Sequence, residues 1–293
     1  MKLGVLVPLN LYSTPELIRT FGITAEALGF DSLWIGEHVV ITDNYEANYP
    51  VSEDGQMPLE NVEDNVELDI FTSLAYLAAV TGRIRLGSAI CVLPQRNPVY
   101  TAKEAGNVDW LSNGRLLFGV GLGWMAEEFK VVGAPFEQRG ARTRSYIEVI
   151  KRLWCDRVSE YHDDFYDLPP CRFYPKPVQR PHPPIILAGN SRPNFRRVAE
   201  QGQGWFAIGA DPEQLAPQLE NLEAALAEAG RPREDISVYV CPFDHEYDRE
   251  MIRQYHELGV DELVLLHYAK SPEQVDTLLN DLAQQYLEFA GSL

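Results

Sequence analysis

The strongest constraint on the fold is a regular alternation between short apolar runs and longer segments of helical periodicity. Eight runs rich in Val, Ile and Leu recur along the chain, each followed by a segment with apolar residues at helical spacing. This alternation is typical of parallel strands that are buried on both faces and connected by helices. The predicted strands span residues 3–9, 32–38, 84–93, 115–121, 184–188, 204–209, 236–242 and 262–268. The predicted helices span residues 15–28, 70–80, 99–111, 142–154, 194–201, 213–229, 247–258 and 272–289.

Eight successive strand–helix units close most economically into a single (β/α)8 barrel. A doubly wound open sheet shows similar alternation and is the alternative architecture. The chain has 293 residues, and barrels of this class often reach about 250 residues or more as one domain. We therefore predict one domain over residues 1–293, with insertions at 39–69 after the second strand and at 124–140 after the fourth. Segment 155–183 is predicted to hold short strands or to cover the bottom of the barrel.

The charge and the cysteines restrict the partners and the compartment. The formal net charge is −18, whereas nucleic acids and anionic membranes are bound by clustered Lys and Arg. No apolar run reaches the roughly 20 residues that span a bilayer. The four cysteines are widely spaced, without a Cys-x-x-Cys pair, which favours a reducing compartment. We expect a cytoplasmic protein that binds neither nucleic acid nor a membrane.

The first insertion is acidic. From Thr20 to Gly82 the sequence has no Lys or Arg. Because like charges repel and keep a segment hydrated, a solvated acidic loop is the simpler interpretation, and a lid over a pocket is the alternative. The carboxylates that accumulate in this stretch are Asp43, Glu46, Glu53, Asp54, Glu60, Glu63, Asp64 and Glu67.

His38 is a candidate catalytic residue because of its place in the pattern. The pair Glu37-His38 closes the second predicted strand, so one of the two side chains should point into the barrel mouth. A histidine at that position can donate or accept a proton near neutral pH. A lone histidine more often has a structural role, so the residues alone leave both interpretations open.

Two junctions at the ends of predicted strands contain glycine. Gly119-Val120-Gly121-Leu122-Gly123 either lets the backbone approach a phosphate or flat ring, or permits tight packing of the barrel strands. It matches the dinucleotide-binding fingerprint only in part, because its third glycine comes too early. Ala188-Gly189-Asn190-Ser191 leads into a helix near Asn194, where free backbone N–H groups can bind a phosphate. An ordinary helix cap is the alternative there.

The sequence lacks the motifs of several other classes of enzyme. The sequence contains no Gly-x-Ser-x-Gly nucleophile elbow and no Gly-x-x-x-x-Gly-Lys-Ser/Thr phosphate loop. No cluster of Asp, Glu and His has a recognisable metal-ligand spacing. The sequence therefore disfavours hydrolase and kinase functions, and we expect no metal.

Three sequence blocks resemble the luciferase-like monooxygenase superfamily. The first is the segment Ala27-Leu28-Gly29-Phe30-Asp31-Ser32-Leu33-Trp34-Ile35-Gly36-Glu37-His38, and the second is Leu116-Leu117-Phe118-Gly119-Val120-Gly121-Leu122-Gly123-Trp124. The third combines Ala188-Gly189-Asn190-Ser191 with Gly202-Gln203-Gly204-Trp205-Phe206, and Arg139-Gly140-Ala141-Arg142-Thr143 lies between the second and third. The blocks occur in the expected order and together cover most of the chain.

This resemblance implies a bacterial-luciferase-type barrel that uses reduced FMN with oxygen, or the deazaflavin coenzyme F-420 as a hydride carrier. The sequence looks closer to the deazaflavin branch. By position, His38 matches a histidine beside the reactive face of the ring, and Ala89-Ile90 falls where the family often has a non-proline cis peptide that supports the ring. The positions that match residues holding the cofactor phosphate are Leu122, Trp124, Gly189, Asn190, Ser191 and Asn194.

Two features depart from the family pattern. Trp124 stands where a sugar-phosphate dehydrogenase of the family has a carboxylate proton donor, so that activity is disfavoured. An anionic cofactor tail should also avoid the acidic insertion, which leaves arginines as its expected partners. The candidate arginines are Arg83, Arg85, Arg96 and the group Arg192, Arg196 and Arg197.

Three functional hypotheses follow from these residues and from the resemblance. The first is a deazaflavin-dependent oxidoreductase, and the second is an FMNH2-dependent monooxygenase supplied by a separate reductase. The third is a flavin-binding protein without turnover, because a fold does not fix a function. Trp124, Tyr45 and Tyr49 suggest a small organic substrate of aromatic or terpenoid size. By analogy with the family we expect a homodimer.

Overall fold

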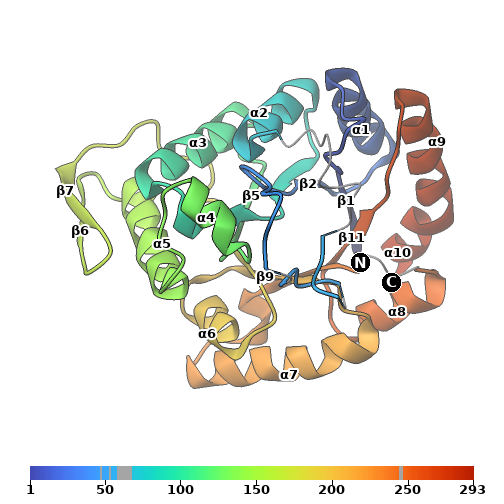
Figure 1. Ribbon diagram of the computed structural model, residues 1–293. Helices are drawn as coiled ribbons and strands as arrows, with labels where there is room; N and C mark the ends of the chain where they lie inside the picture. The colour runs from blue at the N-terminus through green and yellow to red at the C-terminus, as the bar shows by residue number, and fades with distance from the viewer. Residues whose placement is uncertain (47, 53, 58–67, 244–246) are drawn as a thin grey trace.

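Figure 1 shows the computed structural model, in which helices surround a parallel barrel. The structure describes residues 1–46, 48–52, 54–57, 68–243 and 247–293. The barrel strands pair in the order β3-β2-β1-β11-β10-β9-β8-β5, and a further pairing between β5 and β3 closes the ring. These strands are β1 (Lys2–Leu6), β2 (Ser32–Ile35), β3 (Arg85–Ser88), β5 (Leu116–Gly121), β8 (Ile185–Ala188), β9 (Gly204–Ile208), β10 (Ser237–Cys241) and β11 (Glu262–Leu266). The closed ring confirms the predicted (β/α)8 barrel, and the open-sheet alternative is wrong.

The helices begin at residues that satisfy their free N–H groups. Thr14, Asp211 and Ser271 each accept a hydrogen bond from the backbone three residues on, and each precedes a proline at the first helical position. The helices are α1 (Pro15–Leu28), α2 (Ile70–Val80), α3 (Pro98–Leu111), α4 (Ala126–Val131), α5 (Arg139–Cys155), α6 (Arg192–Gln201), α7 (Pro212–Glu228), α8 (Arg249–Glu257), α9 (Pro272–Leu282) and α10 (Glu288–Ser292). Short 3-10 turns span Leu93–Gln95 and Arg233–Asp235, and a π-helical turn spans Ala283–Leu287.

Three segments differ in detail from the prediction. The predicted strand 84–93 is divided into β3 and the short β4 (Cys91–Val92), with a cis peptide between Ala89 and Ile90 at the break. The predicted helix 272–289 is interrupted by the π-helical turn. Segment 155–183 contains an antiparallel hairpin of β6 (Ser159–His162) and β7 (Asp167–Cys171), which confirms the short strands predicted there. The hairpin projects away from the barrel in Figure 1.

Apolar side chains fill the inside of the barrel as well as the layer between strands and helices. Trp34 lies fully buried within the barrel, with its ring centroid 5.0 Å from Phe206 and 5.2 Å from Tyr239. Such contacts add roughly 0.5–1.5 kcal/mol per pair beyond the area they bury. Partly buried apolar residues pack on this cluster and form the floor of the mouth at the carboxyl ends of the strands, namely Leu6, Ala89, Ile90, Ile208 and Phe243.

Glycines allow strands β3 and β5 to approach each other closely. A Cβ atom on Gly119 would lie 1.8 Å from the carbonyl oxygen of Ser88, and one on Gly121 would lie 1.5 Å from Cδ1 of Ile90. The Ser88 hydroxyl also donates a 2.7 Å hydrogen bond to the carbonyl of Gly119. These contacts support the packing interpretation of the Gly119–Gly123 motif.

A buried carboxyl group closes the opposite, amino-terminal end of the barrel. Glu262 begins β11 and is only 3% exposed. Its Oε1 accepts hydrogen bonds from the Ser32 hydroxyl and, at 3.2 Å, from the Trp34 indole nitrogen. Burial raises the pKa of Glu262 above its ordinary value, because the charged form loses its hydration.

We expect Glu262→Gln to remove a pH dependence of stability. A raised folded-state pKa stabilises the fold below the unfolded-state value, and this contribution is lost as the pH rises through the folded-state pKa. Above about pH 4.5 the wild type should therefore lose free energy of unfolding, whereas the variant should not. The loss should be about 1.4 kcal/mol for each unit by which the folded-state pKa of Glu262 exceeds the unfolded-state pKa. Urea unfolding from pH 4 to 8 measures this, with Glu223→Gln on the exposed surface of α7 as the control. Equal pH dependence in both variants would contradict the assignment.

Candidate active site

His38 and Glu37 follow β2 and have different partners. Oε1 of Glu37 accepts a 2.9 Å hydrogen bond from Nε of Arg96, and its Oε2 accepts a 2.7 Å bond from the backbone N–H of Val92. Arg96 also contacts Asp69 at 2.9 Å and Glu104 at 3.1 Å. Glu37 therefore holds β4 and the following turn in place, and His38 is the residue of this pair with a partner across the mouth.

The partner of His38 is Glu128, which the sequence analysis missed. Nδ1 of His38 lies 3.2 Å from Oε2 of Glu128, and Oε1 of Glu128 accepts a 2.6 Å hydrogen bond from the backbone N–H of Val39. Glu128 is only 2% exposed and comes from α4, in the insertion after β5. A buried carboxylate is expected to be hydrogen-bonded, and here its bonds fix both the histidine ring and the chain that follows it. A buried acidic residue in a short helix after Trp124 is the signal that could have identified it.

The predicted ring-binding positions lie at the top of the barrel core. The Ala89–Ile90 peptide is cis, as the resemblance implied. Both residues are partly buried and pack on the barrel core, and the Ala89 N–H donates a 2.7 Å bond to the carbonyl of Ile35. Leu122 follows β5 and is partly buried. These residues provide an apolar platform close to the end of β2, where His38 lies.

Aromatic side chains converge on Trp124. The centroid of its ring lies 6.0 Å from that of His38, 5.4 Å from Tyr45 and 5.3 Å from Tyr49, all in edge-to-face orientation. Tyr49 in turn lies 6.3 Å from Phe243, which follows β10. The two tyrosines come from the first insertion, so this insertion spans from the end of β2 to the end of β10.

Further contacts place the described part of the first insertion over the barrel mouth. A Cβ atom on Gly209, after β9, would lie 3.0 Å from Cγ1 of Val51. The backbone N–H of Glu46 donates a 3.1 Å bond to Glu127 on α4. Figure 1 shows this segment crossing in front of the barrel. The lid alternative is thus supported for the described residues.

The acidic side chains of this insertion face outward. Asp43, Glu46 and Asp54 are exposed, whereas Tyr45 and Tyr49 are partly buried against the barrel. The segment is therefore a lid with a solvated acidic outer face and an aromatic inner face. The other five acidic residues of this run lie outside the described residues, namely Glu53, Glu60, Glu63, Asp64 and Glu67.

The predicted phosphate junction adopts a strand–turn–helix geometry. Gly189 has φ of +117°, and its carbonyl accepts bonds from the indole of Trp205 at 3.0 Å and from Nδ2 of Asn194 at 2.8 Å. Asn190 and Ser191 are exposed, and the Ser191 side chain does not cap α6. Asn194 is 2% exposed, and its Oδ1 accepts a 2.9 Å bond from Arg197. Asn194 therefore shapes the turn, while Asn190 and Ser191 can face a ligand.

Three of the six arginines expected to meet an anionic cofactor tail are placed unfavourably for that role. Arg96 is neutralised by three carboxylates, as described above, and Arg85 begins β3 at the opposite end of the barrel. Arg197 is buried against Asn194, and burial lowers its pKa because the charged form is desolvated. Arg192 and Arg196 are exposed on α6 beside the predicted phosphate junction, so their role toward an anion stays a prediction.

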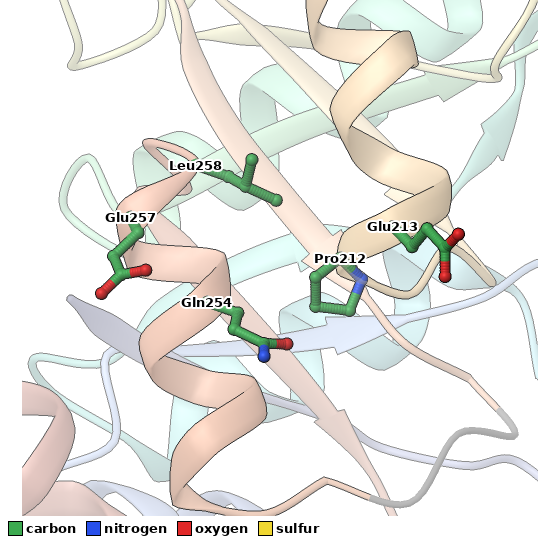
Figure 2. Close-up of a pocket in the computed structure, with 5 residues that line it drawn as sticks. All are labelled: Pro212, Glu213, Gln254, Glu257 and Leu258. Carbon is green, nitrogen blue, oxygen red and sulfur yellow. The ribbon is translucent and has the colours of Figure 1, made fainter.

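A separate surface groove lies between the start of α7 and the end of α8. Pro212, Glu213, Gln254, Glu257 and Leu258 line it, as Figure 2 shows. None of these five residues is a predicted site residue. Over the described ranges, no three side chains of His, Cys, Asp or Glu are grouped as a metal site would require. Nor does any helix in those ranges have the length and apolar character needed to cross a membrane.

Comparison with known proteins links this geometry to one protein family. A family model described as luciferase-like monooxygenase matches residues 1–243. An uncharacterised protein of Mycobacterium tuberculosis is 31% identical over 243 residues, which are 82% of this chain and 83% of that protein. An FMNH2-dependent dimethylsulfone monooxygenase of Pseudomonas putida is 28% identical over 193 residues, which are 64% of this chain and 53% of that protein.

The fold comparison agrees with the sequence comparison. The coenzyme F420 dependent tetrahydromethanopterin reductase of Methanopyrus kandleri superposes with a TM-score of 0.75 at 16% identity, covering 98% of this chain and 99% of that chain. At this identity the likeness shows the shared fold alone.

Proposed function

Because the chain belongs to the luciferase-like monooxygenase family and is an oxidoreductase of that kind, we propose that its barrel mouth binds a reduced deazaflavin, coenzyme F-420, for hydride transfer to or from a small organic substrate. The observation that carries this proposal is the convergence of His38, Trp124 and the Ala89–Ile90 platform at one end of the barrel. The family likeness supports a flavin-type cofactor. The preference for the deazaflavin rests on the resemblance of the sequence blocks.

The residues at the mouth fit a flat ring with an anionic tail. Ala89 and Ile90 offer an apolar surface on the barrel core, and Gly121 leaves room for the Ile90 side chain beneath it. The exposed residues Asn190 and Ser191 would hold the phosphate at the start of α6, where backbone N–H groups favour an anion. When bound, the cofactor supplies the hydride, and the protein supplies orientation and exclusion of water.

The protein's chemical contribution is assigned to the pair His38 and Glu128. When the Nδ1–H of His38 donates a hydrogen bond to the Glu128 carboxylate, Nε2 is the nitrogen that can accept a proton in the neutral ring. Oε1 of Glu128 is held by the Val39 N–H, so the carboxylate cannot rotate away without losing that bond. His38 would then move the proton that balances hydride transfer at the substrate oxygen or carbon.

We expect Glu128→Gln to lower turnover without abolishing cofactor binding. A glutamine preserves the size of the side chain, but its oxygen must face the Val39 N–H, so its NH2 group faces Nδ1 of His38 and favours the other tautomer. The expected loss in kcat is on the order of tenfold or more, part of the roughly 10²–10⁴-fold that a positioned acid or base contributes. Nitrogen-15 NMR of His38 should show the proton on Nδ1 in the wild type and on Nε2 in this variant. The same tautomer in both proteins would contradict the role of Glu128.

An FMNH2-dependent monooxygenase is the second candidate function, because the dimethylsulfone monooxygenase relative has that activity. The two functions differ in the fate of oxygen. Turnover under labelled O2 places the label in the product of a monooxygenase, whereas a deazaflavin-dependent hydride transfer leaves the product unlabelled and proceeds without O2. We expect an unlabelled product. Incorporation of label would replace the proposal with the monooxygenase and imply a separate reductase as partner.

We also propose a cytoplasmic homodimer. The four cysteines, all in the described part of the chain, form no disulfide, which supports a reducing compartment. Helix α3 exposes Tyr100, Trp110 and Leu111 by 72%, 52% and 68%, which is high for large apolar side chains. These residues support a subunit contact on α3, and light scattering of the purified chain measures its mass.

A further inference from the structure

We propose that the lid selects an uncharged, planar aromatic substrate. This inference rests on the proposed function and deepens it, because it concerns the substrate class of the same barrel mouth. It is carried by three features: the edge-to-face contacts that close the lid, the apolar floor beneath them, and the pairing of the charged groups around them.

The lid is closed by aromatic contacts that a substrate must interrupt. Tyr45 and Tyr49 both contact Trp124, and Tyr49 also contacts Phe243. A ligand that enters between the lid and the floor separates these rings. A planar aromatic ligand replaces each lost contact with a new ring contact, whereas a saturated ligand of the same size restores only the buried area. Entry therefore favours an aromatic ring over an aliphatic one.

The floor and the charged groups favour a ligand without charge. Ile90, Ile208 and Leu6 pack on the barrel core and present apolar surface at the mouth. An anion would lose its hydration at this floor, and Arg139 already donates to the carbonyl of Gly123 and stacks on Phe136. Of the nearby guanidinium groups, Arg96 is neutralised by three carboxylates. A desolvated anion would thus lack a cationic partner among these groups.

A cationic ligand is disfavoured because the nearby carboxylates already have partners. Glu128 is bonded to Val39 and faces His38, and Glu37 is bonded to Arg96. Both buried carboxylates next to His38 are engaged, and a buried cation would compete with their present partners.

Four probes of similar size test the inference by calorimetric titration of the full-length protein, with and without coenzyme F-420. They are 2-naphthol, decahydro-2-naphthol, 2-naphthoate and trimethylcyclohexylammonium. We expect 2-naphthol to bind on the order of tenfold more tightly than decahydro-2-naphthol, as the loss of two or three ring contacts implies. We expect a similar margin over the two charged probes, because a buried charge without a partner loses its hydration. Tyr49→Leu should remove the preference for the aromatic alcohol over the saturated one. Tyr174→Leu, at an exposed position after the hairpin, should keep it.

The outcomes separate this inference from the proposed function. Equal binding of any other probe, no binding of 2-naphthol, or an unchanged preference in Tyr49→Leu would overturn the inference. Cofactor binding is read in the same samples from the fluorescence of F-420. Cofactor binding without an aromatic preference overturns only the substrate class, whereas an aromatic preference without cofactor binding overturns only the proposed function.

Discussion

Replacement of His38 by alanine is expected to lower kcat by roughly 10²–10⁴-fold, the contribution of a positioned general acid or base. The dissociation constant of the cofactor should change little, because the ring platform at Ala89 and Ile90 and the turn at Gly189 are built by other strands. Stopped-flow measurement of cofactor oxidation, together with a fluorescence titration of binding, checks both halves of this prediction.

Two further variants make the His38 result specific. His38→Asn keeps a hydrogen-bonding group beside Glu128 but cannot carry the proton, so its turnover should be as low as that of the alanine variant. His162→Ala, on the exposed β6 strand of the hairpin, should leave turnover unchanged. Wild-type turnover in His38→Ala would remove this residue from the mechanism.

Replacement of Gly119 by alanine is expected to have the largest effect on stability. The new Cβ would lie 1.8 Å from the backbone oxygen of Ser88, so β3 and β5 would have to separate at the point where they close the barrel. Overpacking in a dense core costs typically about 1–3 kcal/mol, and here the clash is with a backbone atom rather than with a movable side-chain end. Urea unfolding should show a loss at the upper end of this range or beyond it.

Gly82→Ala is the matched control, because a Cβ at this position would meet only Glu26 Oε1 at 3.9 Å. Its free energy of unfolding should stay within about 0.5 kcal/mol of the wild type, as for most surface substitutions. If Gly119→Ala were as stable as this control but had lost cofactor phosphate binding, the glycine would serve the ligand and the packing interpretation would fail.

The barrel could be predicted from sequence because its strands and helices each impose a periodic pattern of apolar residues. Buried parallel strands require continuous apolar runs, and the helices between them require apolar residues at helical spacing, so both signals are local. The closure of the ring between β3 and β5 is not local, and only the count of strand–helix units pointed to it. The break in strand 84–93 had no periodic signal and came from the family resemblance.

The site was predicted less completely because its contacts join distant insertions. His38 and Glu128 are 90 residues apart, and neither insertion has a periodicity that fixes its path. Composition predicted the acidic outer face of the lid but not its aromatic inner face. The inward orientation of Tyr49 depends on its contacts with Trp124 and Phe243, which are distant in sequence. For the same reason Arg96 was counted as an available cation, although three carboxylates already surround it.

The central claim is that the barrel mouth holds a flavin-type ring with its phosphate at the start of α6. Parallel titrations with coenzyme F-420 and FMN, read by fluorescence quenching, test it most directly in the wild type, in Ser191→Asp and in Ser292→Asp. We predict saturable binding of both cofactors with the deazaflavin preferred. A carboxylate at Ser191 should weaken binding on the order of tenfold, by repulsion of the phosphate, and one at the exposed Ser292 should have no effect. The claim would be contradicted if neither cofactor bound to the wild type, or if all three proteins bound the cofactors with equal affinity.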